Sequence, residues 1–174
     1  MGSRANAIRP NLAPQNGLAG YQVAAICYRH RRAEIEFLLV QTDGGRWTFP
    51  KGQVNSELGA RKSAHHEALE EAGAYGLIGE RPFHTFRWCK GVFWKPKSEQ
   101  EIPVLAFLLE VTHQVEPEQK FRKPTWFSPA QARERLCERR EMKHKREMNL
   151  LLELALLAAK PQKNGDRHLP LKLQ

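Results

Sequence analysis

FPKGQVNSELGARKSAHHEALEEAGAYG, residues 49–76, carries the clearest structural signal in this chain. Its first part, 51–57, is polar and predicts a loop, in which Ser56 is the expected N-cap of the next element. Small, apolar and charged residues then run without a break from Gly59 to Ala72, which predicts a helix. Gly73 is expected to end this helix, because glycine readily adopts the left-handed conformation of a C-cap.

Three glutamates of this helix, Glu67, Glu70 and Glu71, share one face. At 3.6 residues per turn they span an arc of about 100°. Like charges at these spacings repel by roughly 0.2–0.5 kcal/mol per pair, and no Lys or Arg stands three or four residues away to offset the repulsion. A bound Mg²⁺ or Mn²⁺ would remove this conflict, since hard cations prefer carboxylate oxygens. An exposed acidic helix face is the alternative interpretation.

The rest of the chain alternates between strand and helix signals. Apolar and β-branched runs predict strands at 21–28, 35–41, 46–49, 83–90, 103–111 and 123–127. Helices are predicted at 128–139, opened by Ser128 and Pro129, and at 142–160, with Leu150, Leu151, Leu154 and Leu157 on one face. This order predicts an α/β (α+β) fold in which a mixed sheet has helices on both faces.

Composition sets the context of this fold. The 174 residues suffice for one domain at 20–160, flanked by flexible segments at 1–19 and 161–174. The three cysteines are odd in number and far apart, and we find neither a secretory signal nor an apolar run long enough to span a bilayer, so we expect a soluble, cytoplasmic protein without a membrane partner. The net charge of +9 favours anionic partners. The oligomeric state stays open, with a homodimer as one option.

Residues 52–74 resemble the Nudix box, G-x5-E-x7-R-E-U-x-E-E-x-G-U, in which U is a bulky apolar residue. Gly52, Glu67, Glu70, Glu71 and Gly73 fall in register without a gap. The segments RWTFPKG (46–52) and PTWFSPAQA (124–132) also look like this family, most of all like the branch that acts on diphosphoinositol polyphosphates and diadenosine polyphosphates. The resemblance implies a Nudix α/β/α sandwich and a metal-dependent pyrophosphohydrolase that cleaves an acid anhydride.

The resemblance also implies roles for particular residues. Mg²⁺ (or Mn²⁺) would be held by Glu67, Glu70 and Glu71 and by the backbone carbonyl of Gly52, and these three glutamates would be the catalytic residues. Glu70 is the expected general base, with Glu99 and Glu101 as candidates for a distant acid. The cations expected to bind the phosphates of the substrate are Lys51, Arg46, Arg87 and Lys90.

Two positions depart from the box. Leu58 stands where the box has Glu, and His66 stands where it has Arg. Both members of an opposite-charge set are therefore replaced together, which leaves no stranded charge and indicates a coordinated replacement.

The substrate is the least determined feature. The basic and aromatic segment 87–97 suits a long anionic ligand, so a dinucleoside polyphosphate or a diphosphoinositol polyphosphate is the preferred interpretation. A nucleotide sugar and the 5′ end of RNA are alternatives, with RNA as the less favoured partner. A non-catalytic nucleic-acid-binding module on a Nudix scaffold is the alternative from a different class of protein.

Overall fold

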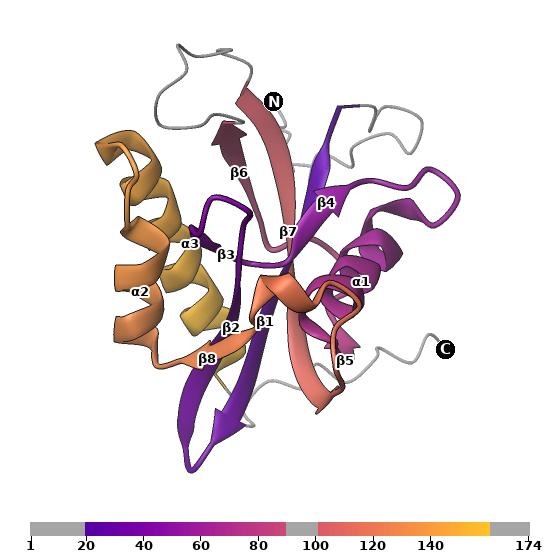
Figure 1. Ribbon diagram of the computed structural model, residues 1–174, viewed down its shortest axis with the longest axis horizontal. Helices are drawn as coiled ribbons and strands as arrows, with labels where there is room; N and C mark the ends of the chain where they lie inside the picture. Colours follow the sequence, from indigo (N-terminus) through magenta and orange to yellow (C-terminus); the bar gives the residue numbers. More distant parts are fainter. Residues whose placement is uncertain (1–19, 90–100, 161–174) are drawn as a thin grey trace, which may run out of the picture.

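The computed structural model describes residues 20–89 and 101–160 (Figure 1). The elements are β1 (Gln22–Arg31), β2 (Glu34–Gln41), β3 (Trp47–Thr48), β4 (Lys51–Gln53), α1 (Gly59–Ala72), β5 (Ala74–Ile78), β6 (His84–Cys89), β7 (Glu101–Gln114), the 3-10 helix η1 (Lys120–Arg122), β8 (Thr125–Phe127), α2 (Pro129–Cys137) and α3 (Met142–Ala159). The predictions made for 1–19, for 161–174, for Lys90 and for Glu99 lie outside the described residues.

The strands form one mixed sheet around β1 and β7. These two long strands run parallel, and the other pairings are antiparallel. One edge of β1 pairs with both β4 and β2, while β6 and β5 pair with β7. The sheet order β3-β2-β1-β7-β5 results, with β4, β6 and β8 attached to β1, β7 and β2. The predicted mixed sheet is confirmed.

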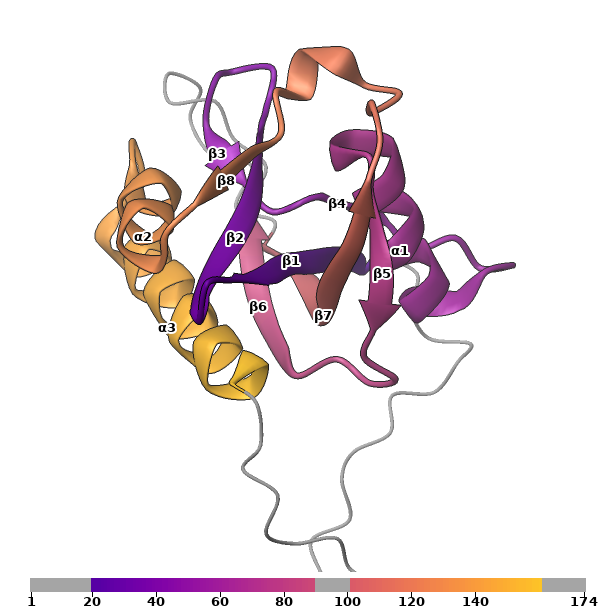
Figure 2. The ribbon, with the colours of Figure 1, turned by 90° about the horizontal axis from the view of Figure 1, so that it is seen from below.

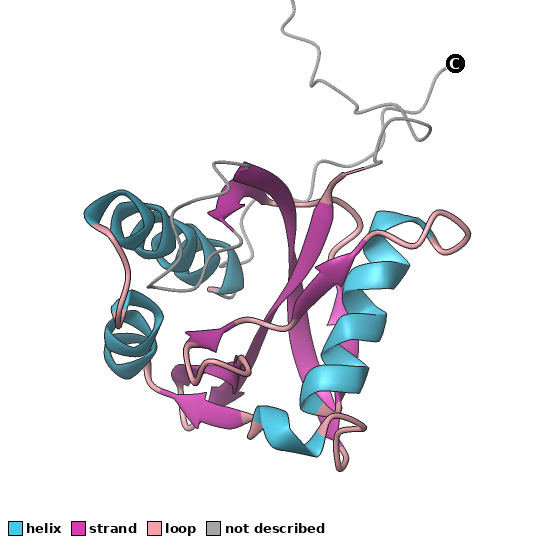
Figure 3. Cartoon of the chain, turned by 45° about the horizontal axis from the view of Figure 1, so that its top comes forward, coloured by secondary structure: helices cyan, strands magenta, loops and turns pink. Residues whose placement is uncertain are grey.

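Helices cover both faces of this sheet, with α1 on one side and α2 and α3 on the other (Figures 2 and 3). The residues of β1 show why both faces need cover. Ala24 and Ile26 belong to the core under α2 and α3, whereas Ala25 and Cys27 face the core beneath α1, and all four are fully buried. The predicted α/β/α layering is therefore confirmed. Among the described residues, no helix is long and apolar enough to cross a membrane.

The first hairpin is tighter than predicted. Both strands extend into the polar segment between them and leave a two-residue turn, Arg32-Ala33, in which both residues have positive φ angles of 50° and 68°. Residues with positive φ at both central positions match the right-handed twist of the strands in such a turn.

Two short strands contradict the sequence prediction. The segment 51–57, predicted as a loop, begins with β4, whose Gly52 pairs with Val23 of β1. The predicted elements also omit β5, which follows α1 directly and pairs with β7 through a register shift between Tyr75 and Gly76. Both elements are strands because they pair with strands distant in the sequence, and their own residues therefore did not predict them.

The ends of α1 match one prediction and contradict another. Gly73 ends the helix at φ 62°, and its amide donates to the Leu69 carbonyl at 2.9 Å. The N-cap, however, is Leu58 and not Ser56. The helix has no side-chain cap; the Asn55 side chain instead closes the turn before it, because its Oδ1 accepts the amide of Glu57 at 2.9 Å. The Ser63 hydroxyl accepts the Asn55 amide at 2.9 Å and so fixes the loop against the helix.

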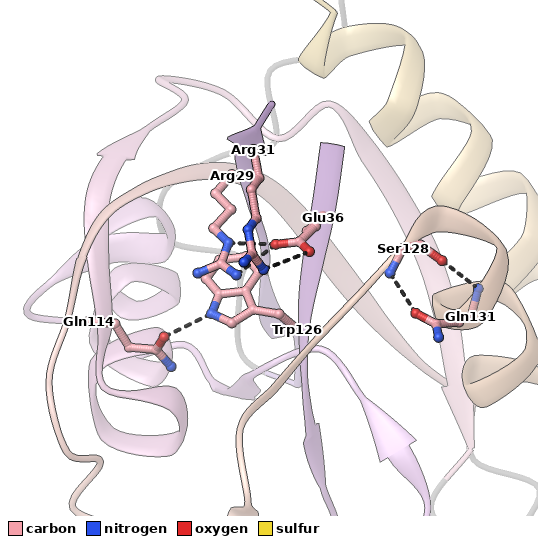
Figure 4. A network of polar contacts seen from close by, with 7 residues as sticks. All are labelled: Arg29, Arg31, Glu36, Gln114, Trp126, Ser128 and Gln131. Carbon is pink, nitrogen blue, oxygen red and sulfur yellow. Dashed lines mark hydrogen bonds and ion pairs between the residues drawn. The ribbon is translucent and has the colours of Figure 1, made fainter. Parts of the chain in front are cut away.

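Figure 4 shows how β8 and α2 are attached. The guanidinium of Arg29 lies 4.0 Å from the Trp126 ring centroid, and the Trp126 indole N–H donates to Gln114 at 2.9 Å. Next to it, the Ser128 hydroxyl accepts the Gln131 amide while the Gln131 side chain accepts the Ser128 amide, as in a capping box. The N-cap role predicted for Ser128 is confirmed.

The buried face of α3 differs from the predicted one. Met148, Leu151, Leu152, Ala155 and Ala159 are buried, whereas Leu150 and Leu157 are exposed. The run of leucines allowed several choices of face, and contacts with β6 and α2 decide between them.

Candidate active site

The small residues of α1 bring its glutamates close to the sheet. Ala64, Ala68 and Ala72 recur every four residues and are completely buried. Because these side chains are only methyl groups, the helix axis can approach the strands closely. Glu71 lies on the same side and is only 3% exposed, so a carboxylate is buried among these alanines.

Glu71 is held through both of its oxygens. Its Oε1 pairs with the Arg122 guanidinium of η1 at 2.6 Å, and its Oε2 accepts the backbone amide of Lys51 at 3.1 Å. Burial raises the pKa of Glu71, and the Arg122 charge opposes this shift. A buried charge with a partner and a hydrogen bond is tolerated, whereas a bare one is not.

Glu67 packs against the bare backbone of Gly52. A methyl group added at Gly52 would overlap both oxygens of the Glu67 carboxylate. Burial, together with the charges of Glu71 and Glu70, raises the pKa of Glu67 to about 7. Glu67 also lines a hollow of about 410 Å³ between β4 and α1, so ligands can reach this carboxylate from solvent.

Glu70 lies toward the surface. Its Oε2 is 3.2 Å from Nδ1 of His66, one turn earlier in α1, and 29% of its side chain is exposed. The backbone carbonyl of Glu70 accepts the Gln119 amide at 3.1 Å, which ties α1 to the segment before η1. Glu70, like Glu67, is thus partly exposed, whereas Glu71 is buried.

The donor chemistry of this site fits a divalent cation. The carboxylates of one helix repel one another, and their hard oxygens are the ligands that a divalent cation prefers. Because Gly52 has no side chain, the Glu67 carboxylate can lie against its backbone, where any side chain would displace it. In the described residues, however, no three His, Cys, Asp or Glu side chains are already gathered as a metal site. Glu67, Glu70 and the Gly52 backbone would therefore hold the ion, and Glu71 would join them by exchanging its contact with Arg122.

Basic side chains gather beside the carboxylates around the ring of Trp88 on β6. Lys51 Nζ lies 4.2 Å from the ring centroid, the Arg140 guanidinium 4.7 Å and the Arg46 guanidinium 5.9 Å. We call Arg46, Lys51, Arg140 and Trp88 the Trp88 cluster. Burial lowers the pKa of Lys51 to about 8. The structure thus brings together two of the predicted phosphate-binding cations.

The other predicted site residues lie elsewhere. Arg87 is exposed, its Nε lies 3.7 Å from Glu101, and its backbone amide donates to Glu147 of α3 at 3.2 Å. Glu101 pairs with Lys143 of α3 as well, and these cations lower its pKa, the Lys143 hydrogen bond most of all. A carboxylate held by two cations is a weak proton acceptor, so the contacts of Glu101 do not favour the role of a distant base.

Leu58 and His66, the two departures from the box, lie near each other. Both line the hollow that contains Glu67 and also a second one, of about 470 Å³, between α1 and β5. The sequence interpretation of a joint replacement is thus consistent with their shared surroundings.

Three residues of the site were missed by sequence reasoning. Arg122 reaches Glu71 from 51 positions later in the chain, and no spacing rule connects them. Arg140 follows α2, where its charge merges with a mixed run of Arg and Glu. Trp88 has no distinctive spacing in the sequence, although alternation along β6 could have indicated that it faces the same side as Phe86.

Comparisons with known proteins agree with this geometry. A family model described as the NUDIX domain matches residues 20–149. A search of curated proteins finds no match.

Several solved structures have the same fold. The chain is similar to a C. elegans Ap4A hydrolase in a binary complex, with a TM-score of 0.56 and 23% identity, over 79% of this chain and 97% of that chain. It is also similar to the NUDIX domain of Shewanella oneidensis NrtR complexed with ADP ribose, with a TM-score of 0.58 and 15% identity, over 85% and 94% of the two chains. Shewanella oneidensis NrtR complexed with a 27mer DNA matches with a TM-score of 0.54 and 13% identity, over 79% of this chain and 61% of that one. At these identities the similarity concerns the fold.

Proposed function

The chain belongs to the Nudix family of pyrophosphohydrolases, and from this premise we propose that it hydrolyses a phosphoanhydride bond in a polyphosphorylated small molecule. The preferred substrates are dinucleoside polyphosphates and diphosphoinositol polyphosphates. The observation that carries the proposal is the contact of Glu67 with Gly52, directly beside Lys51. A carboxylate thus lies against the backbone of β4, one residue from a cation. The similarity in fold to an Ap4A hydrolase supports the same choice.

The proposed cofactor is Mg²⁺, or Mn²⁺, at Glu67, Glu70 and the Gly52 carbonyl, with Glu71 as a further ligand. When bound, such an ion neutralises charge on the diphosphate and acidifies a coordinated water. Phosphoryl transfer depends mainly on positioning and on charge neutralisation, and this chain supplies both. Lys51 and Arg46 bind phosphate oxygens, and the accessible Glu70 accepts the proton of the attacking water at its carboxylate.

The free thiols of Cys27 and Cys137 support a reducing compartment, and we propose the cytoplasm as the site of action. We expect an anionic small molecule, and not a macromolecule, to be the main partner.

A substrate panel tests the proposed function. Diadenosine tetraphosphate, a diphosphoinositol polyphosphate, ADP-ribose and a 5′-triphosphate RNA oligonucleotide are each incubated with the full chain and Mg²⁺, and the phosphate products are separated. We expect turnover of the first two to exceed that of the others, and we expect Glu70→Gln to remove most of it. Undiminished hydrolysis in excess chelator would contradict the proposed chemistry.

One observation favours a second candidate, a non-catalytic nucleic-acid-binding module. Both oxygens of Glu71 are held by Arg122 and Lys51, and Glu70 is paired with His66, so part of the acidic cluster is satisfied by protein groups. Among its neighbours in fold, NrtR has been solved with a 27mer DNA. Submicromolar binding of duplex DNA or RNA, with no turnover on the whole panel, would favour this candidate.

A further inference from the structure

The hollow of about 470 Å³ between α1 and β5 contains none of the three glutamates of the candidate active site. Basic side chains of α1 line one part of it, and aliphatic side chains of α1, of β5 and of the residue before α1 line the rest. Among the described residues, no Asp or Glu lines it. We call it the α1–β5 hollow, and its lining, basic and aliphatic, differs in chemistry from the active site.

The cations of the α1–β5 hollow have no acidic partners. Arg61 and Lys62 are both exposed, and in the part of the chain that the structure describes neither forms an ion pair with a carboxylate. Burial, and next the charges of Arg61 and His66, lower the pKa of His65 beside them. The hollow therefore presents positive charge that its own lining does not offset.

The aliphatic part of the hollow is open to solvent. Leu77 is 70% exposed and Leu58 is 39% exposed, while Leu69 and Ile78 are partly buried. An apolar side chain bound among these four would remove apolar surface from water on both sides of the contact. Leu58 stands where the Nudix box has Glu, so this departure places an apolar side chain, and not an acid, beside the two cations.

β5 adds an open strand edge to this surface. It is the last strand of the sheet order and lies next to α1 (Figure 2). The Gly79 amide donates inward to the Leu108 carbonyl of β7 at 2.9 Å. Because peptide groups alternate along a strand, the amide and carbonyl of Ile78 point away from β7, and Arg61 donates to this carbonyl at 3.0 Å. An open edge of this kind can pair with an extended chain.

An extended peptide with acidic and apolar side chains matches all three features. Nucleic acid matches less well, because aliphatic side chains form much of the lining and no Phe, Tyr or Trp is available for stacking. A second copy of this chain would bring the same positive charge against itself. The chain's own remaining segments are also basic: 1–19 has two Arg and no acid, 90–100 has three Lys and one Glu, and 161–174 has two Lys and one Arg with one Asp.

We propose that the α1–β5 hollow docks an acidic segment of another protein, which extends along the outer edge of β5 and places an apolar side chain among the leucines. The cations of α1 select the acidic residues of this segment, and the strand edge selects its extended form. This interaction surface is separate from the proposed hydrolysis and does not depend on it.

Model peptides test the docking surface. A labelled heptapeptide in which Glu and Leu alternate, and a second in which Glu and Ser alternate, are titrated into the full chain by fluorescence anisotropy in about 0.15 M NaCl, which screens non-specific attraction. We expect the Glu–Leu peptide to bind roughly tenfold more tightly, since burial of one leucine contributes at least this much.

A matched pair of double variants locates the binding. Lys62→Glu with Leu77→Asp should weaken binding of the Glu–Leu peptide by about tenfold or more. Arg146→Glu with Leu157→Asp is the control, because it makes the same change of charge at two exposed residues of α3 and should keep the wild-type affinity. This control also separates docking from a general attraction of acidic peptides to a basic protein.

Each outcome decides the question. No binding of the Glu–Leu peptide, equal binding of both peptides, or an equal loss in both double variants would overturn the proposal. Duplex DNA that binds the wild type and not the first double variant would assign the surface to nucleic acid, and a dimer in sedimentation velocity that Leu77→Asp dissociates would assign it to a second copy; either result overturns the peptide.

Amide hydrogen exchange of the wild type keeps the proposal testable if the first double variant fails to fold. The Ile78 amide faces away from β7 and should exchange more slowly when the Glu–Leu peptide is bound. Bound peptide with unchanged exchange at this amide would contradict pairing with β5.

Discussion

At Gly52, the lack of a side chain determines where Glu67 can lie. A Cβ at this position would overlap the Glu67 carboxylate, which is the flexible end of a side chain and can move aside. At Gly76, in contrast, a Cβ would overlap the backbone carbonyl of Glu110, which cannot move without disturbing the sheet. The first glycine therefore serves the site and the second serves the fold.

Gly52→Ala is accordingly expected to separate activity from stability. Displacement of the carboxylate should reduce kcat/KM by roughly 100-fold, about 2.7 kcal/mol in transition-state terms. The free energy of unfolding should change by less than about 1 kcal/mol, because only a side-chain end must move. Steady-state kinetics and urea unfolding measure the two effects. Gly44→Ala is the control, since a Cβ there meets only the Thr42 hydroxyl at 3.9 Å; equal kinetic losses in both variants would contradict the role of Gly52.

Glu70 and Glu71 differ in burial, and their variants should differ in stability. Glu71→Gln leaves the Arg122 guanidinium without its charged partner in a mostly buried position, and we expect a loss of about 1–3 kcal/mol. Glu70→Gln breaks only a part-exposed contact with His66, so its cost should stay below about 0.5 kcal/mol. Urea unfolding of the two variants measures this difference, and both should lose most activity. Equal stability of the two proteins would show that the pair with Arg122 contributes nothing.

At the scale of elements, the sequence predicts features that depend on neighbouring residues, and it does not predict those that depend on pairing with distant parts of the chain. The C-terminal end of α1 follows from Gly73, and the capping of α2 follows from Ser128 with Pro129, because these residues act within a few positions of themselves. β4 has three residues and becomes a strand only because β1 lies beside it. Arg122 reaches Glu71 through the same kind of long-range packing. Sequence reasoning therefore found the acidic half of the site, which lies on one helix, and missed the contacts assembled from several elements.

Leu58 and His66, the two departures from the box, lie at the start of α1 and on its surface. A double-mutant cycle tests whether their effects on stability are coupled. Leu58→Glu alone adds an anion near Glu67, and His66→Arg alone adds a permanent cation near Glu70. Both together restore an opposite-charge set, so we expect a coupling of about 0.5 kcal/mol or more in the free energy of unfolding. Combining His66→Arg with Leu157→Glu is the control, because Leu157 is 64% exposed on the distant α3. Strict additivity in the first cycle would mean that the two departures are unrelated.

Across the whole molecule, the site brings an acidic and a basic group of side chains next to each other. The glutamates of α1 lie on one side of Lys51, and the Trp88 cluster lies on the other. Lys51 contacts both groups, the acidic one through its backbone amide and the basic one through its side chain. The net charge of +9 indicated an anionic partner, but only the fold shows where opposite charges are segregated beside one another.

The acidic half of this arrangement predicts that Mg²⁺ stabilises the folded chain. An ion that binds only the folded state adds about 2.7 kcal/mol at 100 times its Kd. For a domain of this size, that gain should raise Tm by roughly 5–10 °C. Differential scanning calorimetry measures the shift, with NaCl at matched ionic strength as the reference, because general screening also changes the stability of a basic protein.

Two variants locate this effect on α1. Glu67→Gln removes the carboxylate that lies against Gly52, and it should abolish most of the Tm shift. Glu101→Gln removes an acid that Lys143 and Arg87 already neutralise, so the shift should stay as in the wild type. If Mg²⁺ and Mn²⁺ leave Tm unchanged at millimolar concentration, the carboxylates of α1 are satisfied by Arg122 and His66 alone. That result would favour the second candidate function, the non-catalytic nucleic-acid-binding module.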